Sequence, residues 1–357
     1  MKKFISNPEN QKKMIKMASL GFAALRSGHF ATQGLLLPLI DRFVLKTKRE
    51  TPQNYPQHLK NAFPKIRSLI EKDCEHIANG LYPITVLKPE NLLQHTLRYP
   101  RIVKESLAAA RRRDENDSKQ FDAQAEEYLA EMPEYYSRNF HFQPSGYLGE
   151  TSADLYEHQV EILFSGAADA MRRMILAPLK IHFQNSDGEG LHFLEIGSGT
   201  GRLTRFVALA FPKAKITCVD LSPVYLQKAK NRLRDFPRIN FVQAAGEELP
   251  FKEQSFDAVF SCFLFHELPY EVRQKVIADS MRVLKTGGFV GLVDSLQKND
   301  DPDFDWALEQ FPKDFHEPFY KDYTQKPMES LLDSHGLSSV TTEVGFLSKV
   351  VSAVKIN

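Results

Sequence analysis

The chain has 357 residues, which is more than one ordinary domain core accommodates and is comfortable for two domains. Hydrophobic residues make up 42% and charged residues 25%, the balance of a soluble globular protein and not of a disordered one. The 46 Lys and Arg residues almost cancel the 45 Asp and Glu residues. This balance excludes a global attraction to nucleic acid, so no nucleic-acid partner is expected.

The first residues are basic but continue polar where a secretion signal would turn apolar. The longest apolar run, around Leu35 to Ile40, is interrupted by Pro38 and is too short to span a membrane. We expect this run to pack in the core, with peripheral contact to a membrane surface as the alternative. No membrane span is predicted.

Three cysteines, Cys74, Cys218 and Cys262, are widely spaced. Their spacing is not that of a disulfide framework or of a metal site, so no metal ligands are predicted. This usage fits a reducing compartment, and we predict a cytoplasmic protein. The sequence does not indicate an oligomeric state.

Residues 1 to about 110 show apolar positions at three- and four-residue steps, which predicts helices. No catalytic motif is found there. The charge-dense stretch Ala108 to Gln124 is either a solvated helix or a linker, and we favour the linker. The sequence therefore divides into a helical N-terminal region with its linker, residues 1–125, and a second domain, residues 126–357.

Short apolar runs alternate with amphipathic helices beyond Leu191. Continuous apolar runs that alternate with helices predict a parallel, doubly wound α/β sheet. The last two strands are too close for a crossover helix, so we expect an antiparallel hairpin at the end of a seven-stranded sheet. The seven expected strands are LHFLEIG, KITCVDL, NFVQAA, FDAVFSC, GGFVGLVDS, SSVTTEV and KVVSAVKI.

The strongest motif is a strand that ends in Gly197, Gly199 and Gly201 before a helix begins. Glycine permits a sharp turn and lets a ligand approach the backbone closely. This turn lies at the switch point of such a sheet, where ligands bind. A dinucleotide fingerprint needs its third glycine where Arg202 stands, which disfavours a dehydrogenase and suits a nucleoside without phosphate.

Asp220 ends the next strand, where a carboxylate can accept both hydroxyls of a ribose. A role as a helix cap is the plainer interpretation, since Ser222 and Pro223 begin a helix. The segment from Ala244 to Phe251 follows the third strand and is well placed to hold an adenine.

The order LEIGSGTGR, VDLSP, EELPF, SFDAVFSCFLFHELP and RVLKTGG resembles the class I S-adenosylmethionine-dependent methyltransferases, in particular the ubiquinone and menaquinone methyltransferases and related small-molecule enzymes. The resemblance covers about residues 135–357 and implies S-adenosylmethionine as the cofactor. Many relatives carry an acidic residue where Ala245 stands. The cofactor-binding residues that the resemblance implies are Glu195, Gly197, Ser198, Gly199 and Gly201 for the methionine part, Asp220 and Leu221 for the ribose, Gly246 and Glu247 for the adenine, and Cys262 near the sulfonium.

Two histidines are candidates for catalysis. His266 follows the fourth strand, where its pKa suits a general base, or it is a packed side chain bonded to backbone. His316 lies in a segment that often builds the substrate cap in this fold. Aromatic residues form the expected acceptor pocket or simply pack in the core. The candidate pocket residues are Tyr136, Phe140, His141, Tyr147, Phe265 and Tyr320.

The sequence thus predicts methyl transfer to a small, apolar or aromatic acceptor by direct displacement. A protein that binds the cofactor without turnover and a protein methyltransferase are the alternatives. Neither the acceptor nor the methylated atom can be derived from the sequence.

Overall fold

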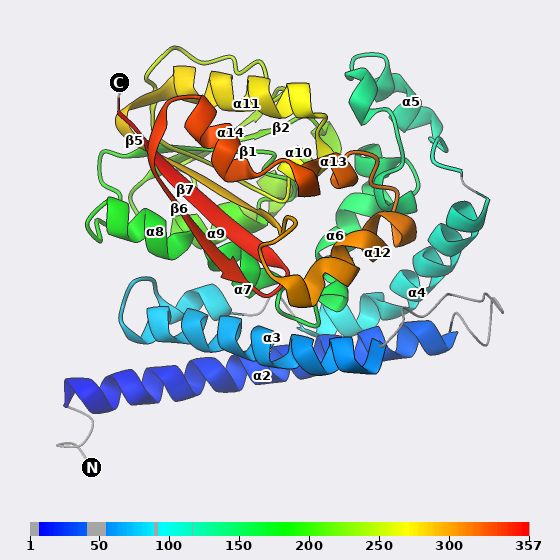
Figure 1. Ribbon diagram of the computed structural model, residues 1–357, viewed down its shortest axis with the longest axis horizontal. Coiled ribbons are helices and arrows are strands. Elements are labelled where there is room, and N and C mark those ends of the chain that lie inside the picture. The colour runs from blue at the N-terminus through cyan, green and yellow to red at the C-terminus, as the bar shows by residue number, and fades with distance from the viewer. Residues whose placement is uncertain (1–6, 41–54, 89–91, 116, 357) are drawn as a thin grey trace.

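The protein is described here by a computed structural model, which covers residues 7–40, 55–88, 92–115 and 117–356 (Figure 1). Its N-terminal third is helical. The helices here are α2 (Pro8–Ile40), α3 (Tyr55–Ala78), α4 (Leu92–Asp114) and α5 (Ala123–Leu129), with a 3-10 helix at Ile84–Leu87. Three 3-10 turns then lead to the second part of the chain, at Glu134–Tyr136, Phe140–Phe142 and Gly146–Leu148.

Seven strands form one sheet in the order β3-β2-β1-β4-β5-β7-β6. Every pair among the first five strands of that order is parallel, whereas β7 is antiparallel to both β5 and β6. The predicted doubly wound sheet with a C-terminal hairpin is therefore confirmed. The strands are β1 (His192–Ile196), β2 (Lys215–Asp220), β3 (Ile239–Gln243), β4 (Phe256–Cys262), β5 (Leu284–Ser295), β6 (Leu337–Gly345) and β7 (Ser348–Lys355).

Helices cover both faces of the sheet, because successive strand residues point to opposite sides. Phe193 of β1 belongs to one apolar core, together with residues of α8 and α9, and its neighbour Leu194 belongs to the other, with residues of α11 and α14. The helices of this part are α6 (Glu150–Leu163), α7 (Ala168–Arg173), α8 (Leu176–His182), α9 (Arg202–Ala210), α10 (Pro223–Arg232), α11 (Tyr270–Val283), α12 (Asp305–Asp314), α13 (Tyr320–Gln325) and α14 (Met328–Ser334).

The N-terminal helices α2 and α3 lie side by side along one end of the sheet domain (Figure 1). Leu69 and Ile77 of α3 are buried in the same core cluster as Phe193 of β1. A buried ion pair adds to this contact, because Arg173 of α7 places its Nη2 2.6 Å from Oδ2 of Asp73 in α3. The helical region is therefore joined to the sheet domain through apolar packing as well as charge.

Two local expectations differ from the structure. Helix α4 continues to Asp114, so the first half of the polar stretch that we favoured as a linker is helical. Leu35 and Leu36 are 70% and 43% exposed, so these two residues of the apolar run do not pack in the core. Among the helices described, none has both the length and the apolar character to cross a bilayer.

Candidate active site

A cleft with about 990 Å³ of free space opens at the carboxyl ends of β1, β2 and β4. We call it the main cleft. The residues singled out from the sequence that line it are Tyr136, Phe140, Tyr147, Glu195, Gly197, Ser198, Gly199, Asp220, Leu221, Gly246, Glu247 and Cys262.

The glycine turn after β1 is held by the carboxylate of Asp220. Gly199 donates its backbone N–H to Oδ2 at 2.7 Å, and Ser222 donates its N–H to Oδ1 at 2.8 Å. Ser222 rather than Asp220 caps α10, because its hydroxyl accepts the N–H of Tyr225 at 3.0 Å. The side chain of Asp220 is therefore not the N-cap of α10. Its carboxylate instead links the glycine turn to the end of β2 through the hydrogen bond from Gly199.

Gly201 has a different task from the other two glycines, because it does not line the main cleft. Its φ of +74° lies in the left-handed region, and a Cβ there would stand 2.7 Å from Cδ1 of Leu233. Glycine therefore starts α9 and lets it pack against the end of α10. By contrast, a Cβ on Gly199 would meet only Tyr225, at 3.9 Å, so the backbone there faces open space.

Glu195 is a buried carboxyl group at the floor of the cleft, 1% exposed. The hydroxyl of Thr204 donates to its Oε2 at 2.5 Å. Burial raises the pKa of Glu195 to about 8, and the negative charge of Asp220 adds to the rise. The group is therefore available to a cation that enters the cleft, since a positive charge nearby favours its ionised form.

Replacing Glu195 with Gln is expected to flatten the dependence of stability on pH. The pKa of this carboxyl is about 8 in the folded chain and about 4.5 when unfolded. Above pH 4.5 the unfolded chain releases a proton that the folded chain retains, so stability is lost as pH rises towards 8. The loss at pH 8 is on the order of 3 kcal/mol. Denaturant unfolding at pH 5.5 and pH 8 measures it, with exposed Glu189→Gln as the control. Identical pH dependence in the wild type and Glu195→Gln would contradict this assignment.

The other end of the cleft contains Gly246 and Glu247, after β3. A Cβ on Gly246 would lie 2.7 Å from Cγ2 of Ile196, so glycine is needed for the loop to approach β1. Tyr135 donates its hydroxyl to Oε1 of Glu247 at 2.7 Å. The hydrogen bond fixes the carboxylate that lines the cleft at the position where the sequence predicts the adenine.

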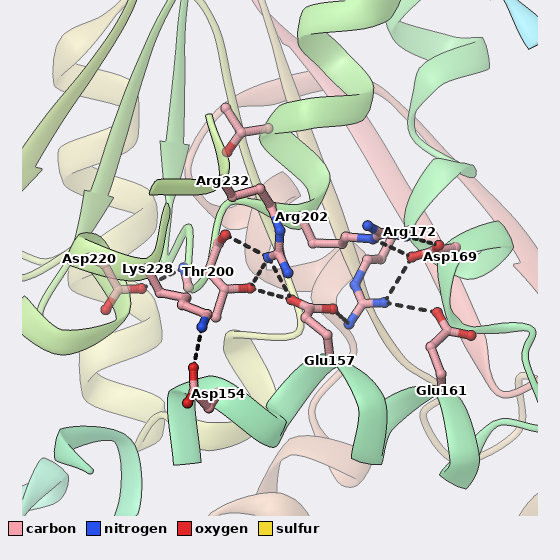
Figure 2. Close-up of polar contacts among 12 residues, drawn as sticks. Asp154, Glu157, Glu161, Asp169, Arg172, Thr200, Arg202, Asp220, Lys228 and Arg232 are labelled. Atoms are coloured by element: carbon pink, nitrogen blue, oxygen red, sulfur yellow. Dashed lines mark hydrogen bonds and ion pairs between the residues drawn. The ribbon is translucent and has the colours of Figure 1, made fainter. Parts of the chain in front are cut away.

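A charged network supports the floor of the main cleft (Figure 2). Glu157 of α6 pairs with Nη2 of Arg172 at 3.1 Å and accepts the hydroxyl of Thr200. Arg202 of α9 donates two hydrogen bonds to Asp169, one of them from Nε at 2.9 Å. Glu157, Arg172 and Arg202 all line the cleft. Sequence reasoning missed them, because charged residues within a helix carry no motif that distinguishes them from a solvated face.

Aromatic rings line a further part of the main cleft. Tyr147 stacks on Phe140 with ring centroids 5.2 Å apart, and it meets Tyr225 edge to face at 5.4 Å. Tyr136 and Tyr156 complete this wall. The faces of aromatic rings attract a cation, so such a wall is suited to a ligand with a positively charged centre.

A second cavity, with about 630 Å³ of free space, adjoins the main cleft. We call it the side cavity. Tyr156, Phe263 and Glu267 line both spaces. His266 lines the side cavity, and its Nδ1 lies 2.5 Å from Oδ1 of Asp294. Burial lowers the pKa of His266, but the buried carboxylate of Asp294 outweighs this and raises it to about 9.

The remaining candidates fall in different places. Tyr320 lines the side cavity and shares a 2.6 Å hydrogen bond with Ser295. His141 lines it as well. Phe265 is 1% exposed and packs in the core of the sheet domain, outside both spaces. His316 also lies outside both, against the ring of Phe142 at 5.5 Å between centroids.

Residues 193–288 match the family described as "Methyltransferase domain". Over 99 residues the chain is 39% identical to the demethylmenaquinone methyltransferase of Tropheryma whipplei, a match that covers 28% of this chain and 39% of the relative. It is 28% identical over 170 residues to the fatty-acid O-methyltransferase of Mycolicibacterium smegmatis, with 47% of this chain and 55% of the relative covered. The matches thus span less than two thirds of either relative.

Among solved structures, an S-adenosylmethionine-dependent methyltransferase from Aquifex aeolicus is similar with a TM-score of 0.39 and 19% identity. The alignment covers 50% of this chain and 89% of that one. The methyltransferase match lies on β1 to the start of β5, the part of the chain that builds the main cleft. Residues 193–288 are thus similar to a methyltransferase domain, and the named relatives that this part of the chain resembles are methyltransferases.

S-Adenosylmethionine is the cofactor of this family, and the residues of the main cleft fit its chemistry. Asp220 offers a carboxylate for the ribose hydroxyls, and Glu195 offers one for the methionine ammonium group. Arg172, which sequence reasoning missed, also lines the main cleft. The aromatic wall of Tyr136 and Tyr147 suits the positively charged sulfur.

Proposed function

We propose that this protein transfers a methyl group from S-adenosylmethionine to a small, apolar or aromatic acceptor bound in the side cavity. The observation that carries the proposal is the junction of the two spaces, where Tyr156, Phe263 and Glu267 face both. A donor in the main cleft and an acceptor in the side cavity would meet at these residues. The cofactor supplies a methyl group on a positively charged sulfur, already activated for displacement.

The protein then has to align the acceptor and exclude water. Such alignment lowers a barrier by roughly 7–11 kcal/mol. Leu163, Phe311 and Tyr320 give the side cavity an apolar lining that suits a quinone, phenol or lipid-like acceptor. His266, held by Asp294, is one polar group of the side cavity that can orient an acceptor oxygen. We therefore assign His266 to positioning of the acceptor.

Calorimetry and an isotope-transfer assay test this function together. Calorimetry with S-adenosylhomocysteine establishes occupancy of the main cleft. The assay then follows a labelled methyl group from S-adenosylmethionine into quinone, phenol and fatty-acid acceptors. Label in one of these classes supports the proposal. Binding without transfer to any acceptor would favour a binding protein without turnover, and label in protein substrates alone would favour a protein methyltransferase.

Filling the side cavity should separate the two binding events. Ala307 of α12 lines this cavity and is partly exposed, so Ala307→Phe adds a ring without entering the apolar core. We expect at least a tenfold loss in kcat/KM for the acceptor and an unchanged affinity for S-adenosylhomocysteine. An unchanged kcat/KM in a normally folded variant would show that the acceptor binds elsewhere.

A further inference from the structure

Three side chains from distant segments converge beside the junction of the main cleft and the side cavity. Nε2 of His141 lies 3.2 Å from Oε1 of Glu317 and 3.5 Å from Oε1 of Glu267. One donor atom from each of the three lies within 4.8 Å of the others. Their side chains are 16%, 0% and 11% exposed for His141, Glu317 and Glu267. One imidazole nitrogen and two carboxylate oxygens thus face the same small space.

Glu317 needs a partner that the described residues do not supply. Its carboxylate is fully buried, and neither oxygen accepts a hydrogen bond. Its carboxylate is approached by Nε2 of His141, at 3.2 Å from Oε1. A buried carboxylate is usually paired, hydrogen-bonded or bound to a metal. Glu317 lies between α12 and α13, and the geometry turns it towards the other two donors instead of towards solvent.

The separations suit a metal ion of ordinary size. Divalent first-row metals bind imidazole nitrogen and carboxylate oxygen at about 2.0–2.2 Å, so neighbouring donors around one ion stand about 3.0–3.5 Å apart. The two distances from His141 Nε2 match this spacing. Three donors on one side leave the remaining coordination positions open.

Further polar groups hold the candidate donors in place. Tyr147 donates its hydroxyl to Oε1 of Glu267. The same hydroxyl lies 3.0 Å from Nε2 of His141, a contact that a bound ion would replace. On the other side of Glu267, Nε2 of His266 approaches Oε1 at 3.7 Å, and Asp294 fixes that ring through Nδ1. Hydrogen-bonding partners of this kind orient metal ligands and sharpen their geometry.

We propose that His141, Glu267 and Glu317 bind one divalent first-row metal ion. Glu267 lines both spaces and His141 lines the side cavity, so the open coordination positions lie where the acceptor enters. The ion would hold an oxygen of the acceptor next to the methyl donor, a role that rests on the proposed function. The binding of the ion itself does not depend on that function.

Cobalt(II) serves as the probe, because its visible absorption reports the ligands. Tag-free, chelator-treated full-length protein is titrated without cofactor, and binding is followed by absorption and by calorimetry. One equivalent is expected to bind, and Glu317→Gln should weaken the affinity by at least about 100-fold. The exposed Glu309 of α12 provides the matched control, since Glu309→Gln makes the same change of charge nearby. Its affinity should equal that of the wild type.

S-Adenosylhomocysteine binding is measured separately on each variant, so loss of the metal is distinguished from loss of the fold or of the cofactor site. Anomalous diffraction from wild-type crystals soaked in Mn²⁺ requires no variant, and a peak among the three side chains is expected. Stoichiometric cobalt binding that Glu317→Gln leaves unchanged would overturn the proposal. So would the absence of binding at millimolar Co²⁺ or Mn²⁺ in a chain that binds S-adenosylhomocysteine.

Discussion

Asp220→Ala is expected to weaken S-adenosylhomocysteine binding by at least 100-fold. The carboxylate fixes the glycine turn through Gly199 and the start of α10 through Ser222, and it faces the main cleft where the ribose is expected. Two hydrogen bonds from a ribose to a charged acceptor are worth about 1.5–3 kcal/mol each, or roughly 10²–10⁴ in affinity together. Isothermal calorimetry with purified protein measures the change.

Asp235→Ala is the matched control, because Asp235 lies on the loop after α10 with 84% of its side chain exposed. It should bind like the wild type. Asp220→Asn separates the two roles of the carboxylate, since an amide oxygen can still accept the N–H of Gly199. A normal affinity in Asp220→Ala would remove this residue from the cofactor site and would place the ribose elsewhere.

Asp169→Asn is expected to lower the free energy of unfolding by about 3–5 kcal/mol. Asp169 is 3% exposed, and its carboxylate faces three guanidinium groups. Arg26 lies 2.7 Å from Oδ2 and Arg172 lies 3.3 Å from Oδ1, while Arg202 donates to both oxygens. The neutral amide of Asn removes one negative charge, so the buried guanidinium groups lose part of their charge compensation. Denaturant unfolding monitored by circular dichroism measures the loss.

Asp187→Asn makes the same change at a site where half of the side chain is exposed, and it should leave the free energy of unfolding close to that of the wild type. The three arginines come from α2, α7 and α9, so this carboxylate connects the N-terminal helices with the floor of the main cleft. An unfolding free energy within 1 kcal/mol of the wild type would mean that Glu157 and Glu161 are enough to balance these cations.

Local patterns were sufficient to predict the sheet. The central strands β1, β2 and β4 are apolar runs that are mostly buried on both faces, and the short spacing between the last two strands leaves a hairpin as their only connection. The glycine turn and Asp220 were equally accessible, because both follow directly from a strand end. The extent of α4 was not, since the charge density of Ala108–Gln124 as a whole favoured a linker. Its first half, Ala108–Asp114, consists mainly of Ala and Arg, which are strong helix formers and continue the helix.

The site beyond the glycine turn depends on contacts between distant segments. Glu157 and Arg172 lie on α6 and α7, where a charged residue usually faces solvent, and only the fold turns them into the cleft. Glu317 lies next to His316, which the sequence analysis named as a candidate for catalysis. Which of the two neighbours approaches His141 and Glu267 depends on the turn between α12 and α13, and the residue types alone do not determine it.

The apolar core shared by α3 and β1 has a consequence for how this chain folds. Leu69 and Ile77 of α3 are buried in the same apolar cluster as Phe193 and Phe206. This face of the sheet is therefore fully covered only when the N-terminal helices pack against it. A chain shortened to residues 126–357 would present this apolar surface to water. The segment that matches the methyltransferase domain, residues 193–288, is therefore smaller than the part of the chain that we expect to unfold cooperatively, which includes the N-terminal helices.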